Sequence, residues 1–210
     1  MSCRALSRLT LSSLEKSNAF PALTKPSRRA FTDQIAALVG LTEGMHMQTH
    51  TLTESPIGDL TLVNTEGVLS GLYMRGRRAP KGAALGERTL TGLEQAVEEL
   101  GEYFGGGRRE FTVTTAAKGD YFQRCVWKLV SQIAYGDTRS YSDIARDLGD
   151  PALARAVGLS NARNPISIVV PCHRVIGSDG SLTGYAGGLE RKRYLLALET
   201  PAEVRAATLF

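Results

Sequence analysis

The sequence predicts an α+β protein, with a small antiparallel sheet in its first half and mostly helices in its second half. Two observations support this fold class. Residues 51–74 contain two runs of alternating apolar residues on either side of a turn at Asn64–Gly67, as in a β-hairpin. Beyond residue 119, apolar residues recur instead at helical spacing. Strands that precede helices in this way are typical of α+β folds.

Composition narrows the class of protein. The chain has 210 residues, of which 42% are hydrophobic and 22% charged, as in ordinary soluble globular proteins. Its apolar runs are shorter than the roughly 18 residues of a membrane span. The three cysteines, Cys3, Cys125 and Cys172, are far apart and form no CxxC pair. Such a set argues against a disulfide framework or a structural zinc site, and it indicates a reducing compartment.

Residues 1–46 differ from the rest of the chain. They carry six basic and three acidic side chains, so three of the four net positive charges lie in this segment. A mitochondrial transit peptide has a similar composition, but we favour a disordered extension or a start codon placed too far upstream. The rest is nearly balanced in charge, so contact with nucleic acid would need a local patch. We therefore expect an extension (1–46), a sheet domain (47–118) and a mainly helical domain (119–210).

In the sheet domain, the elements follow from periodicity. The hairpin of residues 51–74 is followed by a loop rich in glycine and arginine, and then by an apolar stripe at helical spacing from Leu93 to Phe104. The glycines of residues 105–107 end this helix. The sequence EFTVTT, residues 110–115, predicts a further short strand.

In the helical domain, three helices are predicted before residue 164. The first covers residues 120–134 and ends before Gly136. The second begins at Ser140, with Asp143 completing a short capping box, and the third opens with Asp150 as its cap and Pro151 at its first position. The last two resemble a helix-turn-helix, but two packed helices of a core would give the same pattern, so both interpretations stay open.

The segment NPISIVVP, residues 164–171, predicts a buried strand or extended segment that Pro171 ends. Cys172 follows at the end of this element, where functional side chains are common. A cysteine and a histidine side by side are, taken alone, more often a buried apolar thiol and a structural imidazole. However, Asn164, His173 and Arg174 gather polar groups here, and buried polar groups need hydrogen bonds.

The chemistry open to Cys172 is limited by its neighbours. Successive side chains in an extended backbone point apart, so His173 is not expected to touch the sulfur directly, although a water could bridge them. The last predicted helix carries a carboxylate, Glu199, on the side of its apolar face, so a Glu-His-Cys relay is feasible. Ligands for a metal are too few, and neither a Walker loop nor a dinucleotide loop is present, so we expect no metal and no cofactor.

Residues 122–199 resemble the O6-alkylguanine-DNA alkyltransferases, in particular the bacterial methylated-DNA–protein-cysteine methyltransferases. The motifs RAVG, NP, PCHRV and GYAGG, in this order and spacing, carry the resemblance. Residues 48–118 are more weakly similar to the ribonuclease-H-like domain of this family. The resemblance implies a winged helix-turn-helix-like alkyltransferase domain in the second half of the chain.

The resemblance also implies a role for each matching position. Cys172 would be the nucleophile, with His173 acting through a bound water, Glu199 polarising His173, and Asn164 ordering the turn. Tyr141 would contact the phosphate and the flipped guanine, and Arg155 would replace that guanine in the stack. The base pocket would be lined by Val175, Tyr185, Ala186 and Lys192. Some relatives have serine at the position of Ala186, so only its backbone N–H is expected to contact the base.

The function implied is DNA repair by irreversible, single-turnover transfer of an alkyl group from O6-alkylguanine to Cys172, with O4-alkylthymine as an alternative substrate. A thiolate must attack, so the thiol pKa has to be lowered by the relay or by a helix N-terminus. We expect a cytoplasmic monomer whose partner is double-stranded DNA. Two alternatives are an alkyltransferase-like protein that binds DNA without transfer, which would lack the cysteine, and a winged-helix regulator.

Overall fold

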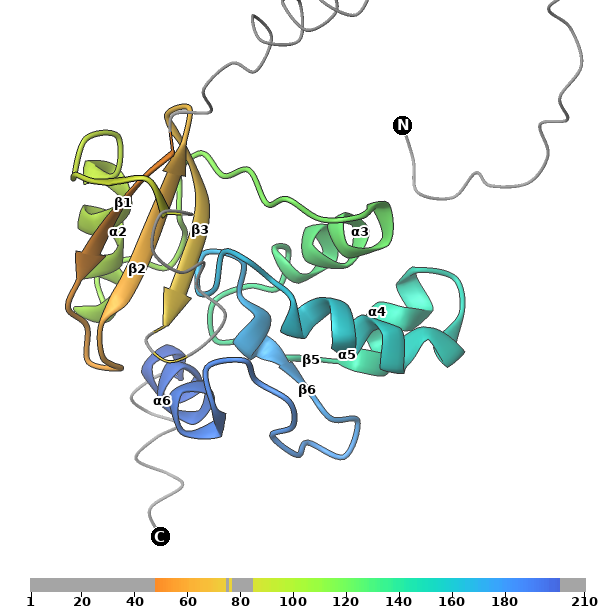
Figure 1. The fold of residues 1–210 in the computed structure, drawn as a ribbon. Helices are drawn as coiled ribbons and strands as arrows, with labels where there is room; N and C mark the ends of the chain where they lie inside the picture. The colour runs from red at the N-terminus through yellow and green to blue at the C-terminus, as the bar shows by residue number, and fades with distance from the viewer. Residues whose placement is uncertain (1–47, 75, 77–84, 201–210) are drawn as a thin grey trace, which may run out of the picture. The chain divides into compact units, whose positions relative to one another are not determined.

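A computed structural model describes residues 48–74, 76 and 85–200 (Figure 1). The predictions for residues 1–46, a disordered extension or a transit peptide, lie outside the described residues. The described elements, in chain order, are β1 (Gln48–Thr53), β2 (Leu60–Thr65), β3 (Val68–Met74), β4 (Glu87–Arg88), α2 (Glu94–Phe104), α3 (Tyr121–Val130), β5 (Arg139–Ser140), α4 (Tyr141–Asp147), η2 (Pro151–Leu153), α5 (Ala154–Ala162), η3 (Cys172–Arg174), β6 (Val175–Ile176) and α6 (Leu189–Glu199).

The first half forms a four-stranded sheet with the strand order β3-β2-β1-β4. β2 and β3 form the predicted antiparallel hairpin, and Glu66 and Gly67 at its turn both have positive φ, as a two-residue hairpin turn requires. The sequence indicated two strands in residues 51–74, whereas the structure has three strands within 48–74, because β1 also pairs with β2. Figure 1 shows α2 behind the sheet. The α+β fold class is confirmed.

The strand predicted at residues 110–115 does not form. Thr115 makes one isolated bridge with Leu69, and the sheet gains its fourth strand from β4, which pairs in parallel with β1. The backbone N–H groups of Thr112 and Val113 donate instead to the carboxylate of Glu99 on α2, at 2.9 and 3.2 Å. A buried carboxylate thus satisfies the donors that a strand ladder would have used.

The helix caps of the second half are as predicted. The Ser140 side chain accepts from the N–H of Asp143 and the Asp143 side chain accepts from the N–H of Ser140, which is a capping box at the start of α4. Asp150 caps η2, where Pro151 stands in the first turn, and η2 leads directly into α5. The first helix is shorter than predicted, since α3 ends at Val130 and not just before Gly136.

The two halves are joined along β3. The N–H of Leu72 donates to the carbonyl of Pro165 at 2.8 Å, and the N–H of Ser167 donates back to the carbonyl of Leu72 at 3.2 Å. Apolar side chains of both halves, among them Leu72, Val126 and Ile166, form one buried cluster. The segment that precedes Cys172 is therefore anchored on the sheet. Among the described residues, no helix is both long and apolar enough to cross a membrane.

Candidate active site

The segment before Cys172 is a tight turn, and neither the strand nor the extended segment that the sequence predicted. Ile168 has a φ of 72°, which is rare for a β-branched residue, and its neighbours make only isolated bridges. The Asn164 side chain closes the turn: its amide donates to the Val170 carbonyl at 2.8 Å and its oxygen accepts from the Ile166 N–H at 3.0 Å. These hydrogen bonds hold a backbone conformation that the apolar composition alone would not favour.

Cys172 begins the short 3-10 helix η3, and its side chain is almost completely buried, with a relative exposure of 3%. Burial raises the pKa of its thiol, while hydrogen bonds with Asn164 and Ser167 and the positive charge of Lys192 act in the opposite direction. The expectation of a lowered thiol pKa is therefore wrong for this state of the protein. Desolvation of the thiolate outweighs the groups that would stabilise it.

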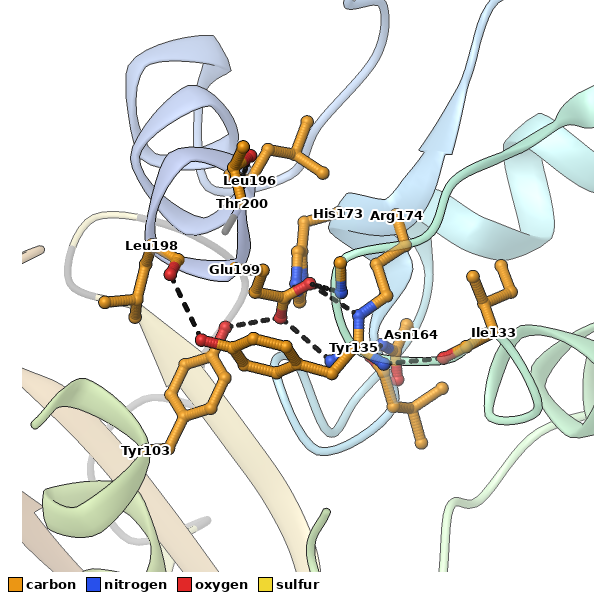
Figure 2. Close-up of polar contacts among 12 residues, drawn as sticks. Tyr103, Ile133, Tyr135, Asn164, His173, Arg174, Leu196, Leu198, Glu199 and Thr200 are labelled. Carbon is orange, nitrogen blue, oxygen red and sulfur yellow. Dashed lines mark hydrogen bonds and ion pairs between the residues drawn. The ribbon is translucent and has the colours of Figure 1, made fainter. Parts of the chain in front are cut away.

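Of the Glu-His-Cys relay predicted from the sequence, the structure shows the contact between Glu199 and His173. His173 is fully buried, and its Nε2 lies 2.9 Å from Oε1 of Glu199, the last residue of α6 (Figure 2). Arg174 binds the same carboxylate through two nitrogens of its guanidinium, with Nε 2.8 Å from Oε2 and Nη2 2.8 Å from Oε1. The hydroxyl of Tyr103, on α2, donates to Oε1 at 2.7 Å.

The charges of this network follow from burial and pairing. Burial opposes ionisation of Glu199, but the hydrogen bonds from His173 and Arg174 prevail and hold its pKa at about 2. Burial lowers the pKa of His173 more than Glu199 raises it, so the imidazole is neutral at neutral pH. A neutral ring must donate its Nε2–H to the carboxylate, which leaves Nδ1 as a buried acceptor with no hydrogen-bond partner among the described residues.

Tyr141 and Lys192 lie together on another side of the site. Tyr141 is the first residue of α4, and its hydroxyl is 3.2 Å from the Thr183 carbonyl. The buried Nζ of Lys192 donates to the carbonyls of Val175 and Thr183 and lies 5.9 Å from the centre of the Tyr141 ring. Burial lowers the pKa of Lys192 to about 8. The structure thus brings Lys192, Tyr141 and the region of Cys172 together.

One of the four residues predicted to line a base pocket, Ala186, borders a cavity of the described structure. Ala186 lines a cavity of about 160 Å³ with Asn164 and Ser167, the two residues that hydrogen-bond the thiol. Val175 and Tyr185 are buried and are not among its lining residues. Tyr185 also lies near Cys172: burial raises the pKa of the Tyr185 phenol well above its usual value, and the charge of the Cys172 thiolate and a hydrogen bond with that side chain act in the same direction.

Arg155 lies on the surface. It is an exposed residue of α5, the second helix of the predicted helix-turn-helix formed with α4. A long, exposed cation on such a helix can reach a phosphate or enter a base stack. Within the described residues, no group of three or more His, Cys, Asp or Glu side chains could hold a metal ion.

Sequence reasoning missed two partners of Glu199. Arg174 was noted only as a polar neighbour of Cys172, although its adjacency to the Cys-His pair was a usable signal. Tyr103 had no such signal, since it is separated from Glu199 by 96 positions and belongs to a helix predicted only to pack on the sheet.

Comparisons with known proteins agree with this arrangement. A family model described as "6-O-methylguanine DNA methyltransferase, DNA binding domain" matches residues 121–201, and one described as "6-O-methylguanine DNA methyltransferase, ribonuclease-like domain" matches residues 49–117. Methylated-DNA–protein-cysteine methyltransferase from Mycolicibacterium paratuberculosis is 48% identical over 157 residues, which are 75% of this chain and 95% of that protein. The protein of the same name from Methanosarcina acetivorans is 43% identical and covers 71% of this chain and 97% of its own length.

Solved structures give the same result. The Mycobacterium tuberculosis O6-methylguanine methyltransferase superposes with a TM-score of 0.68 at 44% identity, over 76% of this chain and 99% of that one. A structure of Mycobacterium tuberculosis OGT in complex with DNA superposes with a TM-score of 0.67 at 44% identity, over 74% and 97%.

Proposed function

The chain belongs to the 6-O-methylguanine DNA methyltransferase family, and on this basis we propose that it repairs DNA by moving the alkyl group of O6-alkylguanine onto its own Cys172. The relatives are named for transfer from methylated DNA to a protein cysteine. The observation that carries the proposal for this chain is the position of Cys172. Its thiol lies beside Asn164, Ser167 and Lys192, and the next residue begins a buried relay to Glu199.

In the proposed reaction, the relay removes the thiol proton. Nδ1 of neutral His173 is the free acceptor, and a water between it and the sulfur would carry the proton across. Glu199 then stabilises the protonated ring, as its hydrogen bond to Nε2 allows. The raised pKa of Cys172 means that the thiolate forms only in part before the alkylated base arrives.

Alkyl transfer is balanced without a further reactant. The thiolate sulfur forms a bond to the alkyl carbon, the bond between that carbon and O6 breaks, and guanine leaves with the electron pair. The proton taken from Cys172 then replaces the alkyl group on guanine. The product is a thioether, which is a poor leaving group, so each molecule is proposed to act once.

The DNA side of the proposal rests on α4 and α5. An alkyl group inside a stacked duplex is out of reach of a buried thiol, so the base must be flipped, at a cost of a few kcal/mol. Arg155 is exposed on α5 and would refill the stack, which offsets part of this cost. Tyr141, held beside Lys192, would contact the flipped guanine and the neighbouring phosphate, and Val175, Tyr185 and Ala186 would surround the base.

A single-turnover assay tests the proposal. The protein is mixed with an excess of duplexes that carry methyl-labelled O6-methylguanine or O4-methylthymine, and the label on the Cys172 peptide is measured by mass spectrometry. We expect at most one methyl group per protein, on Cys172, from the guanine duplex. Tight binding without any transfer would instead support a protein that only binds DNA. Double-stranded DNA as the partner is part of this proposal, whereas a monomeric state and a cytoplasmic location stay predictions.

A further inference from the structure

We propose that Tyr103, from the ribonuclease-like half, is a positioning residue of the transfer site: its hydroxyl shares Oε1 of Glu199 with His173 and limits how strongly that carboxylate holds a protonated His173. The role of Tyr103 in alkyl transfer rests on the proposed function, whereas its contact with Glu199 does not. It gives the first half of the chain a direct part in the chemistry of the second.

Tyr103 is held in one orientation by its surroundings. It is fully buried, and its ring meets those of Phe104, Phe111 and Tyr135 at centroid distances of 5.3, 5.4 and 6.2 Å. Contacts with Phe104 and Tyr135 are edge-to-face, which is a favourable geometry for aromatic pairs. The hydroxyl is therefore fixed on Glu199, 2.7 Å from Oε1.

Oε1 is the more crowded oxygen of the carboxylate. It accepts from Tyr103, from Nε2 of His173 and from Nη2 of Arg174, all within 2.9 Å. A carboxylate oxygen has about two lone-pair sites, so three donors compete for them. Oε2 accepts from Nε of Arg174 at 2.8 Å, with the Gly136 N–H more distant at 3.5 Å. Removal of the Tyr103 hydroxyl would thus free acceptor capacity on the oxygen that faces His173.

Tyr103 can only donate in this contact. Burial, followed by the negative charge of Glu199, raises the pKa of its phenol far above the usual value, so the hydroxyl keeps its proton. It therefore draws negative charge from Oε1 at every working pH. With less negative charge, Oε1 binds the protonated imidazole of His173 less tightly, so His173 returns its proton more readily to the leaving guanine.

Other groups that act on His173 stay in the protein when Tyr103 is changed. Glu199 on α6 favours the protonated ring, whereas Arg174 on η3 and Lys192 on α6 oppose it. Cys172, the preceding residue of η3, is a further titratable neighbour. A Tyr103→Phe variant keeps all four and deletes one hydroxyl.

The test is a pH titration of His173 by nitrogen-15 NMR in the full-length protein without DNA. Tyr103→Phe is expected to raise the pH of half-protonation of His173 by on the order of one unit. The matched control is Tyr135→Phe, which removes a hydroxyl that donates to the Leu198 carbonyl at 3.1 Å and not to Glu199. We expect this control to titrate like the wild type.

A second variant covers the case in which Tyr103→Phe does not fold. Fluorotyrosine placed at position 103 keeps the ring and makes the hydroxyl a stronger donor, so the His173 titration should move to lower pH. The proposal is overturned if a folded Tyr103→Phe, or the fluorotyrosine variant, titrates as the wild type does. Since the titration needs no alkylated DNA, it stands apart from the transfer assay: a wild type that transfers no methyl group refutes the proposed function alone.

Discussion

Replacement of Glu199 with glutamine is expected to destabilise the folded protein by about 3 to 5 kcal/mol at pH 7. The carboxylate is buried and accepts hydrogen bonds from Tyr103, His173 and Arg174. Glutamine has a similar shape, but it carries no charge and presents an N–H₂ donor to a site filled with donors. The guanidinium of Arg174 would then be buried without its counter-ion, which is the main source of the expected loss.

The pKa of Glu199 gives a second route to the same magnitude. Folding lowers this pKa from an ordinary 4.5 to about 2, and each pK unit corresponds to about 1.4 kcal/mol. The ionised carboxylate therefore contributes about 3 kcal/mol at neutral pH. Because the folded pKa lies below the unfolded one, this contribution is complete above about pH 4.5 and is lost as the pH falls toward 2. The gap between wild type and variant should thus narrow to about half by pH 3.

Urea denaturation followed by circular dichroism, at several pH values from 7 to 3, measures this gap. Glu190→Gln is the matched control, because Glu190 is an exposed residue in the first turn of the same helix, α6. The control is expected to change the free energy of unfolding by less than about 0.5 kcal/mol. Equal losses in the two variants, or a loss at Glu199 that does not vary with pH, would refute the reasoning about the buried network.

Three further outcomes concern the reaction. Cys172→Ser is expected to keep duplex binding in a gel-shift assay and to lose methyl transfer. The control Cys125→Ser, on α3, is expected to keep both. Stoichiometric labelling of the Cys172 variant would contradict the assignment of the nucleophile. Arg155→Ala is expected to slow transfer from a duplex by about tenfold or more, which corresponds to about 1.4 kcal/mol, because the side chain that would refill the stack is lost. Transfer from the free base should not change. An equal effect on both substrates would argue against a role in base flipping. Burial raises the pKa of Cys172, so the quench-flow rate of transfer should rise with pH. Lys192→Met removes a positive charge that Lys192 carries below its pKa of about 8, so it should lower the rate below that pH more than above it. An unchanged profile would mean that Lys192 does not stabilise the thiolate.

Local patterns in the sequence were sufficient wherever an element depends on residues close to one another. The capping box of Ser140 and Asp143 and the cap at Asp150 were predicted because their hydrogen bonds span two or three residues. The hairpin turn at Glu66 and Gly67 was readable for the same reason. The family motifs and the last predicted helix likewise identify Cys172, His173 and Glu199 as candidate site residues.

Patterns of composition failed where distant groups compete for the same backbone. The β-branched run at residues 165–170 looked like a strand, yet Asn164 folds it into a turn through two side-chain hydrogen bonds. The run at residues 110–115 also looked like a strand, yet Glu99 accepts two of its N–H groups. In both places a buried polar side chain outweighs the intrinsic preference of the apolar residues around it.

Three features are readable from the sequence: the α+β class, the capped helices that follow the sheet, and the sulfur, imidazole and carboxylate on which the proposed chemistry depends. Only the tertiary structure decided that Glu199 also accepts from Arg174 and from Tyr103, 96 positions away, and that the Cys172 thiol is buried deeply enough to raise its pKa. The physical reason is that capping and turns depend on hydrogen bonds between near neighbours. Protonation, in contrast, depends on the solvent that is excluded and on the charges that packing brings together from anywhere in the chain.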